Sequence, residues 1–152
     1  MAASLPFMKR SLLLVAAFLA ALPCIAKVGD DSLIGCWRST RIAQFVDGQP
    51  ALEDRSGRCT LQFKATEFES RCQGASGLLV VTYSYHVERP NAYAAKMVSS
   101  TASSSLIGTT RDYEYRVQAD HLQLVTYPQG TKPQPAAKVT RVVSESTRVP
   151  CP

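Results

Sequence analysis

The stretch LIGCWR, residues 33–38, contains the single tryptophan of a 152-residue chain. It follows a polar lead-in and precedes a segment in which apolar and polar residues alternate. Gly35 has no side chain and lies two residues before Trp37, so the backbone there can approach the largest apolar side chain closely. This arrangement is typical of a strand that enters the closed end of a β-barrel, where the indole fills the floor.

The chain begins with a pattern typical of a secretory signal peptide. Lys9 and Arg10 precede an apolar run over residues 11–22, and Ala26 supplies a small residue for cleavage. The run is shorter than the roughly 20 residues of a membrane span, so we expect no stable membrane insertion. We therefore divide the chain into a signal peptide, residues 1–26, and a single domain, residues 27–152, that is periplasmic or secreted.

The charge pattern disfavours a nucleic-acid partner. The formal net charge of +5 falls to +3 when the two cations Lys9 and Arg10 leave with the signal peptide. The remaining charges alternate in sign, as in Asp112, Glu114 and Arg116, and form no basic stripe. Alternation of this kind indicates a solvated sheet face. We expect a monomer that binds no nucleic acid.

Removing residues 1–26 leaves four of the five cysteines, an even number that fits an oxidising compartment. Folding residues 59–72 into a hairpin sets Cys59 opposite Cys72, within disulfide range. Cys36 and Cys151 are then left to bond each other, which ties the first strand to the carboxyl terminus. Four cysteines allow three pairings, and the spacing alone leaves the other two open.

The rest of the chain has short alternating segments separated by turn signals, with no helical period longer than a turn. This pattern predicts an all-β fold, a small antiparallel barrel of seven or eight strands with two disulfides. A sandwich uses the same alternation and stays open as an alternative. The expected strands are residues 34–45, 78–88, 93–98 and 137–144, together with the hairpin 59–72 and a second hairpin of 111–117 and 121–127 that sets Tyr115 opposite Leu124. We expect a loop or a weak strand over 49–57, loops over 99–105 and 128–135, and a tail over 146–152.

Strict alternation also assigns strand faces. It places Trp37, Arg41 and Phe45 on one face of the first strand. Four tyrosines fall on inward faces of later strands and are candidate ligand-lining residues: Tyr83, Tyr85, Tyr113 and Tyr115. Phenol rings around a cavity would form an amphipathic pocket for a flat or acyl ligand. The same rings would fill the barrel if there is no cavity, and both readings remain open.

The G-x-W pattern of Gly35 to Trp37 resembles that of the calycins, which include the lipocalins and smaller lipocalin-like barrels of bacterial envelopes. In those families the tryptophan closes the barrel floor beneath an arginine from the last strand, which implies that Arg141 covers Trp37 here. The segment Arg111-Asp112-Tyr113 matches two of three positions of the Thr-Asp-Tyr motif of lipocalins. Cys36 inside the motif and the short chain depart from lipocalins and argue against a large cavity. A plain core tryptophan in another β-fold is the alternative.

The sequence offers no catalytic, cofactor-binding or metal-binding set. His86 and His121 are far apart, and neither a G-x-S-x-G elbow nor a C-x-x-C pair occurs. We interpret the acidic pairs Asp30-Asp31 and Glu53-Asp54 as solvated surface. We therefore expect a protein that is not an enzyme and needs no cofactor.

Two functions fit these features. The first is non-enzymatic binding of a small apolar or amphipathic ligand inside the barrel. The alternative is a protein-binding module, such as a secreted hydrolase inhibitor or an envelope assembly factor, that presents the loops over residues 49–57, 99–105 and 128–135. An open interior of several hundred Å3 would favour the first, because ligand pockets have volumes of about 300–1,000 Å3.

Overall fold

The computed structural model describes residues 29–128 and 140–152, so the expected signal peptide lies outside the described residues. Within the described ranges, no helix is long and apolar enough to cross a membrane. These ranges contain nine strands: β1 (Gly35–Val46), β2 (Gln49–Asp54), β3 (Cys59–Phe63), β4 (Glu67–Gly74), β5 (Gly77–Arg89), β6 (Ala92–Ser100), β7 (Thr110–Gln118), β8 (His121–Thr126) and β9 (Thr140–Val149).

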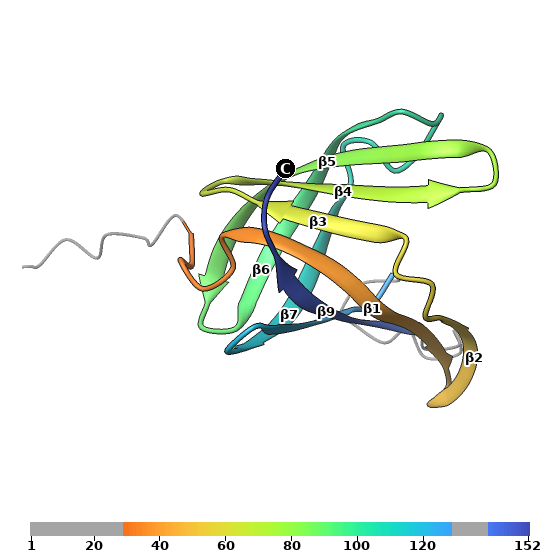
Figure 1. Cartoon of the computed structure of the whole chain (residues 1–152), viewed down its shortest axis with the longest axis horizontal. Helices are drawn as coiled ribbons and strands as arrows, with labels where there is room; N and C mark the ends of the chain where they lie inside the picture. The colour runs from red at the N-terminus through yellow and green to blue at the C-terminus, as the bar shows by residue number, and fades with distance from the viewer. Residues whose placement is uncertain (1–28, 129–139) are drawn as a thin grey trace, which may run out of the picture.

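Eight of these strands, β1 and β3 to β9, form a closed antiparallel barrel (Figure 1). β1 pairs with β3, each strand from β3 to β8 pairs with the next along the chain, and β9 returns to pair with β1. The remaining strand, β2, pairs with the second half of β1 and projects beyond the barrel. The prediction of an all-β barrel is confirmed, and closure through β1 and β9 decides between barrel and sandwich.

The two hairpins have the registers that the alternation predicts. In β3 and β4, Cys59 is paired with Cys72 and Phe63 with Phe68. In β7 and β8, Tyr115 is paired with Leu124 around a turn in which Ala119 has a φ of 50°. Registers are strongly specified when one face of a hairpin is buried, because a slip of one residue would turn every apolar side chain outward.

A β-bulge in β1 changes which residues of the first strand face the interior. The register against β9 shifts between Ser39 and Arg41. Trp37 and Ser39 face inward before the bulge, whereas Ile42 does so after it. Arg41 instead forms an ion pair with Glu145 on the outside of the barrel. The predicted common face of the first strand is therefore wrong beyond Ser39. The extra residue at the bulge moves each later side chain to the opposite face of the strand.

The strands are longer than expected in several places. Residues 49–54, expected as a loop or a weak strand, form β2, and β6 continues to Ser100. Thr101 then exchanges two hydrogen bonds with the backbone of Val80, at 2.9 and 3.0 Å, so the start of the expected loop over 99–105 is held against β5. β9 continues to Val149, so the expected tail is largely strand. Residues 129–139, with most of the loop expected over 128–135, lie outside the described residues.

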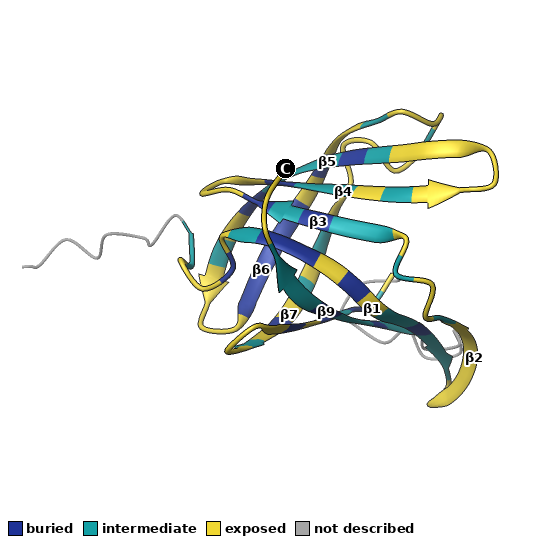
Figure 2. Ribbon diagram, viewed as in Figure 1, coloured by how far each residue is buried: buried dark blue, intermediate teal, exposed yellow. Residues whose placement is uncertain are grey.

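The core is a cluster of aromatic and aliphatic side chains along the inside of the barrel. Figure 2 shows buried segments along the middle of the strands, with the β4–β5 turn and β2 exposed. Phe63 and Phe68 stack with ring centroids 4.7 Å apart, and Tyr85 meets Phe63 edge-on at 5.6 Å. The cluster also contains Leu33, Trp37, Leu61, Tyr93, Ala95, Tyr115, Leu122 and Leu124.

Both expected disulfides are present. Cys59 and Cys72 join β3 to β4, with Cα atoms 4.1 Å apart. Cys36 and Cys151 join β1 to the carboxyl terminus, with Cα atoms 5.2 Å apart and 115 residues of sequence separation. The first bridge reinforces a hairpin, whereas the second links the two ends of the described domain.

Removal of the two bridges should have unequal effects. Replacing Cys36 and Cys151 with serine should lower the free energy of unfolding by about 5 kcal/mol, and replacing Cys59 and Cys72 by about 3 kcal/mol, because the longer loop gives the unfolded chain more entropy to regain. Urea denaturation under oxidising conditions measures both. With a reducing agent present, each variant and the parent protein should have the same free energy of unfolding. Equal losses in the two variants, or a larger loss for the Cys59–Cys72 variant, would contradict this account.

Candidate functional site

Trp37 closes one end of the barrel. Its side chain is 0% exposed, and its indole N–H donates a hydrogen bond to the carbonyl oxygen of Leu33 at 2.8 Å. The guanidinium of Arg148 lies 4.0 Å from the centroid of the Trp37 ring. The same guanidinium donates hydrogen bonds to the carbonyl oxygens of Ile34 at 2.8 Å and Ser32 at 2.9 Å. One cation thus covers the indole and fixes the chain that enters β1.

The arginine over Trp37 is Arg148, and the expectation that Arg141 covers the indole is wrong. Arg141 lies over the ring of Phe45 instead, at 4.7 Å. Because β9 runs antiparallel to β1, the end of β9 lies beside the start of β1. An expected last strand that stopped at residue 144 left Arg148 outside it.

Gly35 makes the approach of this arginine possible. Its φ is +129°, and a Cβ at this position would lie 2.7 Å from Nη1 of Arg148. A side chain would therefore clash with the guanidinium as well as strain the backbone. The glycine of the G-x-W pattern is required by the arginine that covers the tryptophan.

The residues before β1 complete the floor. Leu33 is 0% exposed, and its N–H donates to the carbonyl oxygen of Asp30 at 2.9 Å. The Tyr115 hydroxyl donates to the Asp30 carboxylate at 2.6 Å. Asp30 is therefore not the purely solvated residue that the sequence indicated. The Tyr85 hydroxyl donates to the carbonyl oxygen of Lys64 at 2.7 Å. Tyr85 and Tyr115 belong to this filled half of the barrel and are not among the residues that line the open cavity, so they fill the barrel, the second of the two roles that the sequence left open.

The opposite half of the barrel contains a partly open cavity of about 230 Å3. Its lining includes Cys59 at the start of β3, Arg111 near the start of β7 and Thr126 at the end of β8. These strand ends lie away from Trp37, so the cavity opens at the end opposite the floor. Two of the four predicted lining tyrosines, Tyr83 and Tyr113, are among the residues around it.

Four aromatic rings form the walls of the cavity. Phe68 and Tyr83 stack at 4.5 Å with 11° between their planes, and Tyr93 and Tyr113 stack at 4.9 Å with 10° between theirs. Phe68 and Tyr113 meet edge to face at 6.4 Å. Tyr93, which the sequence placed on a strand but not on the inward face, is a lining residue that the alternation missed.

The cavity has few polar groups. Arg111 is the only charged residue among the described residues that line it, and it is half-buried. Tyr93 is 1% exposed, and its buried hydroxyl has no hydrogen-bond partner among the described residues. Small hydroxyl side chains complete the polar lining at Ser39, Ser70, Thr126 and Ser144.

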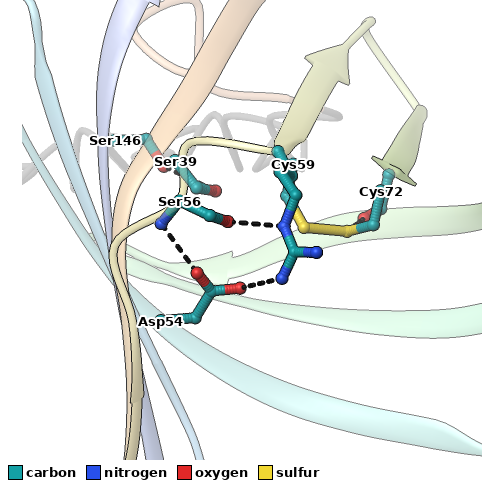
Figure 3. The surroundings of a disulfide bond; sticks show 8 residues. Ser39, Asp54, Ser56, Cys59, Cys72 and Ser146 are labelled. Carbon is teal, nitrogen blue, oxygen red and sulfur yellow. Dashed lines mark hydrogen bonds and ion pairs between the residues drawn. A yellow bond between two sulfur atoms is a disulfide. The ribbon is translucent and has the colours of Figure 1, made fainter. Parts of the chain in front are cut away.

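The Cys59–Cys72 bridge forms part of the wall where β2 leads into β3 (Figure 3). Asp54 accepts a hydrogen bond from the backbone N–H of Ser56 at 2.7 Å, and Arg58 donates to the Ser56 hydroxyl at 2.8 Å. Hydrogen bonds to Asp54 from the Ser56 side chain and from the Ser56 backbone N–H, with a smaller contribution from Arg58, hold the pKa of the Asp54 carboxyl below its usual value. The bridge and this turn together fix the rim beside the cavity.

Burial raises the pKa of the phenols inside the barrel. The pKa of Tyr113 is raised to about 12, mainly by burial, and a hydrogen bond from Arg111 partly opposes the shift. Burial likewise raises the pKa values of Tyr83 and Tyr85, and raises that of Tyr93 well above its usual value. These hydroxyls are therefore neutral at physiological pH and can act as hydrogen-bond donors.

The described residues bring no catalytic set together. His86 is 67% exposed at its side chain and lies 3.6 Å from Glu88 on the outer face of β5. His121 is exposed at the start of β8. Within residues 29–128 and 140–152, no three His, Cys, Asp or Glu side chains are grouped so that they could hold a metal ion.

Comparison with solved structures shows a lipocalin-like fold. The chain superposes on a lipocalin-like protein from Bacteroides uniformis with a TM-score of 0.52 and 10% sequence identity, over 78% of this chain and 99% of that one. A protein of uncharacterised function from Bacteroides eggerthii matches with a TM-score of 0.49 and 11% identity, over 76% and 98% of the two chains. No protein-family model matches the sequence, and no curated protein matches it. The predicted calycin-like fold is confirmed.

Arginine-to-lysine changes at two positions of β9 keep the positive charge and remove only the guanidinium. They should therefore show whether the floor depends on the guanidinium of Arg148. Arg148→Lys should lower the free energy of unfolding by about 1–3 kcal/mol, because a lysine cannot make both carbonyl hydrogen bonds while stacking on the indole. Arg141→Lys, the matched control, should change it by less than about 0.5 kcal/mol. Urea denaturation followed by Trp37 fluorescence measures both, and equal losses would show that the floor does not depend on Arg148.

Stability should decline in alkaline solution. The pKa of Tyr113 is about 12 in the folded protein and about 10 in the unfolded chain. Between about pH 10 and about pH 12 the folded protein therefore binds more protons than the unfolded chain. This stabilisation is complete below about pH 10 and is lost as the pH rises toward about 12. Urea midpoints at about pH 9 and about pH 11 measure the decline. Tyr113→Phe should make the decline shallower, and an unchanged slope in that variant would contradict the assignment.

Proposed function

We propose that this lipocalin-like barrel is a non-enzymatic binding protein that takes a small apolar or amphipathic ligand into the cavity at its open end. The observation that carries the proposal is a cavity of about 230 Å3 walled by Phe68, Tyr83, Tyr93 and Tyr113. Binding sites for small molecules are typically concave and mostly apolar, with a few placed polar groups. The lipocalin-like fold supports the same reading, since barrels of this architecture enclose ligands at their mouths.

The size of the cavity limits the ligand. Because Trp37, Phe63, Tyr85 and Tyr115 fill the half of the barrel near the floor, the space available is smaller than the roughly 300–1,000 Å3 typical of ligand pockets. The volume is below the several hundred Å3 expected of an open ligand-binding interior, so a ligand in it must be a compact molecule with one ring or a short chain and not a long acyl chain.

We also infer that the chain is exported, with residues 1–26 removed. The two disulfides support this inference, because such bonds persist in oxidising compartments. Amino-terminal sequencing of the protein recovered from its native compartment should give Lys27 as the first residue, and an intact Met1 terminus would contradict the inference.

The protein-binding alternative has one observation in its favour. Apolar side chains are exposed near the open end, on the β4–β5 turn and around the β6–β7 connection: Leu78 is 52% exposed, Val98 51% and Ile107 48%. Exposed apolar groups that cluster can mark a protein contact. A barrel that retains no small molecule when purified, and that pulls down one partner through these residues, would favour this alternative.

Filling the cavity should abolish ligand binding without unfolding the barrel. Ser144 lines the cavity, so Ser144→Phe should place a ring in it and weaken the binding of any co-purified small molecule by at least about tenfold. Ser84 lies between Glu67 and Lys96 on the outer face, so Ser84→Phe is a matched control that should retain binding. Native mass spectrometry of protein purified from its own compartment measures the bound molecule.

The proposal would be contradicted in two ways. The first is recovery of the parent protein without any small molecule, together with no binding of the small molecules in an extract of its own compartment. The second is equal binding of the molecule by Ser144→Phe and Ser84→Phe, which would place it outside the barrel. Circular dichroism of each variant establishes that the barrel has formed before binding is compared.

A further inference from the structure

We propose that the open end of the barrel docks on an anionic lipid surface through exposed aliphatic side chains beside the cavity. The contact is peripheral and reversible. Five residues form the docking surface, which we call the apolar rim: Leu78, Leu79, Val98, Leu106 and Ile107. None of the five lines the cavity, so the inference goes beyond the proposed function and does not depend on it.

The apolar rim belongs to two segments that meet at the open end of the barrel (Figure 1). One is residues 72–81, around the β4–β5 turn, and the other is residues 97–110, from the end of β6 to the start of β7. The N–H of Thr101 donates to the carbonyl oxygen of Val80 at 2.9 Å, and the N–H of Val80 donates to the Thr101 hydroxyl at 3.0 Å. These two bonds join the segments side by side.

A further hydrogen bond folds the β6–β7 connection back on β6. The N–H of Gly108 donates to the carbonyl oxygen of Met97 at 2.8 Å, so Leu106 and Ile107 are held close to Val98, which follows Met97. Five of the seven large apolar side chains that are exposed among the described residues therefore lie in these two joined segments. An exposed apolar surface of this kind marks a contact with another apolar phase.

The two segments carry no charge. Residues 72–81 and 97–110 contain no aspartate, glutamate, lysine or arginine, although these residues make up 19% of the chain. A charged group must lose its hydration when it meets an apolar phase, so an uncharged surface docks on one at a lower cost. The β1–β2 hairpin, on the other side of the open end, carries Asp47, Glu53 and Asp54. One side of the open end is thus suited to this contact.

The charges that border the two segments are positive. Arg71 precedes the first segment, and Lys96 and Arg111 flank the second. The nearest carboxylates along these strands, Glu69 and Asp112, lie further from the open end, and Glu69 forms an ion pair with Arg71. Lys96 is exposed and takes part in none of the ion pairs among the described residues. A cationic border complements an anionic surface.

The spacing of the border matches the depth of a lipid interface. Lys96 precedes Val98 by two residues on β6, which places it about 7 Å further from the open end, since a strand rises about 3.3 Å per residue. Apolar side chains of peripheral proteins lie about 5–10 Å deep, at the boundary between headgroups and acyl chains. With the apolar rim at that depth, the ammonium group of Lys96 lies level with the headgroup phosphates.

The composition of the two segments favours a lipid over a protein partner. Eight of the 14 residues over 97–110 are serine or threonine, and neither segment contains an aromatic residue. Protein interfaces are depleted in serine and alanine, and their binding energy is concentrated in tryptophan, tyrosine and arginine. Aliphatic side chains can enter the headgroup boundary, and the hydroxyl groups beside them can bond to headgroup oxygens.

The test is co-sedimentation of the protein with vesicles of phosphatidylcholine and phosphatidylglycerol in equal parts. The parent protein should bind these vesicles about tenfold more tightly than vesicles of phosphatidylcholine alone, because each bordering cation adds to the attraction. The double variant Leu78→Ser, Ile107→Ser should bind them about tenfold less tightly than the parent, because it loses two apolar contacts. Leu52→Ser is the matched control, since Leu52 is 69% exposed on β2, and it should bind like the parent.

A second pair of variants tests the charge. Lys96→Gln should weaken binding to the anionic vesicles by about fivefold and leave binding to phosphatidylcholine unchanged. Lys64→Gln, at an exposed lysine in the β3–β4 turn near the floor, is the matched control and should change neither. A thermal melt of each variant establishes that the barrel has formed before binding is compared.

Hydrogen exchange locates the contact without any substitution. When the parent protein binds the anionic vesicles, the backbone amides of residues 75–79 and 102–107 should exchange more slowly, whereas those of the exposed strand β2 should not change. Slower exchange at β2 and none at the apolar rim would place the lipid elsewhere and contradict the inference.

The other occupants of the apolar rim give different results. If the parent protein does not bind the anionic vesicles, the inference is wrong, even where the apolar rim captures a protein. If the parent self-associates in analytical ultracentrifugation and the Leu78→Ser, Ile107→Ser variant does not, a second copy covers the apolar rim and the inference is wrong. Equal weakening by Leu52→Ser and the double variant also contradicts it.

Ser144→Phe separates this inference from the proposed function. This variant fills the cavity and leaves the apolar rim unchanged, so it should bind the anionic vesicles like the parent. Loss of vesicle binding in Ser144→Phe would show that a lipid enters the cavity, which would overturn the docking inference and support a binding barrel. Vesicle binding by a parent protein that takes up no small molecule would support docking and contradict the proposed function.

Discussion

The packing of Arg148 on Trp37 is the contact on which the rest of the barrel depends. A single guanidinium covers the indole at 4.0 Å and donates hydrogen bonds to the backbone of Ser32 and Ile34. It therefore joins the last strand, the first strand and the lead-in at the point where the sheet closes on itself. Gly35 admits this side chain because it has no Cβ, and the Cys36–Cys151 bridge joins the same two chain ends covalently. A cation and a covalent bond thus close the barrel at neighbouring positions.

Closure at this end divides the interior into two unlike halves. Near the floor, every polar group of the tyrosines has a partner: Tyr115 donates to Asp30 and Tyr85 to Lys64. Satisfied hydroxyls and close ring packing leave this half solid. Toward the mouth, the lining changes to Arg111, small hydroxyl residues and stacked rings, which leave about 230 Å3 unfilled. The division explains how a short lipocalin-like chain can have both a solid core and an open cavity.

The polar groups of the cavity differ from those of the core in a way that bears on function. Proteins rarely leave a buried hydroxyl unpaired, because its desolvation is not repaid. Tyr93 is an exception among the described residues, because its buried hydroxyl makes no hydrogen bond with them, and Arg111 is the one charged group among the described residues that line the cavity. The Cys59–Cys72 bridge and the Asp54–Ser56 turn hold the wall beside them in place. A ligand entering this space would meet preformed surfaces and would not need to order them.

The sequence by itself determined the features that depend on local alternation and on chemistry. It predicted the all-β class, the registers of both hairpins and the two disulfides, because a period of two with one buried face admits one register and that register sets Cys59 beside Cys72. It also identified Trp37 with Gly35 as the floor, and two of the lining residues, Tyr83 and Tyr113.

Only the tertiary structure decided which distant residues meet. It placed Arg148 over Trp37 in place of Arg141, because the pairing of β1 with β9 spans the length of the domain and is not encoded in either strand alone. Because of a bulge in β1, Ile42 faces inward and Arg41 faces outward. Hydrogen bonds to Lys64 and Asp30, on other segments, hold Tyr85 and Tyr115 in the core. The cavity arises from the closure of eight strands around one volume, which no single segment of the sequence specifies.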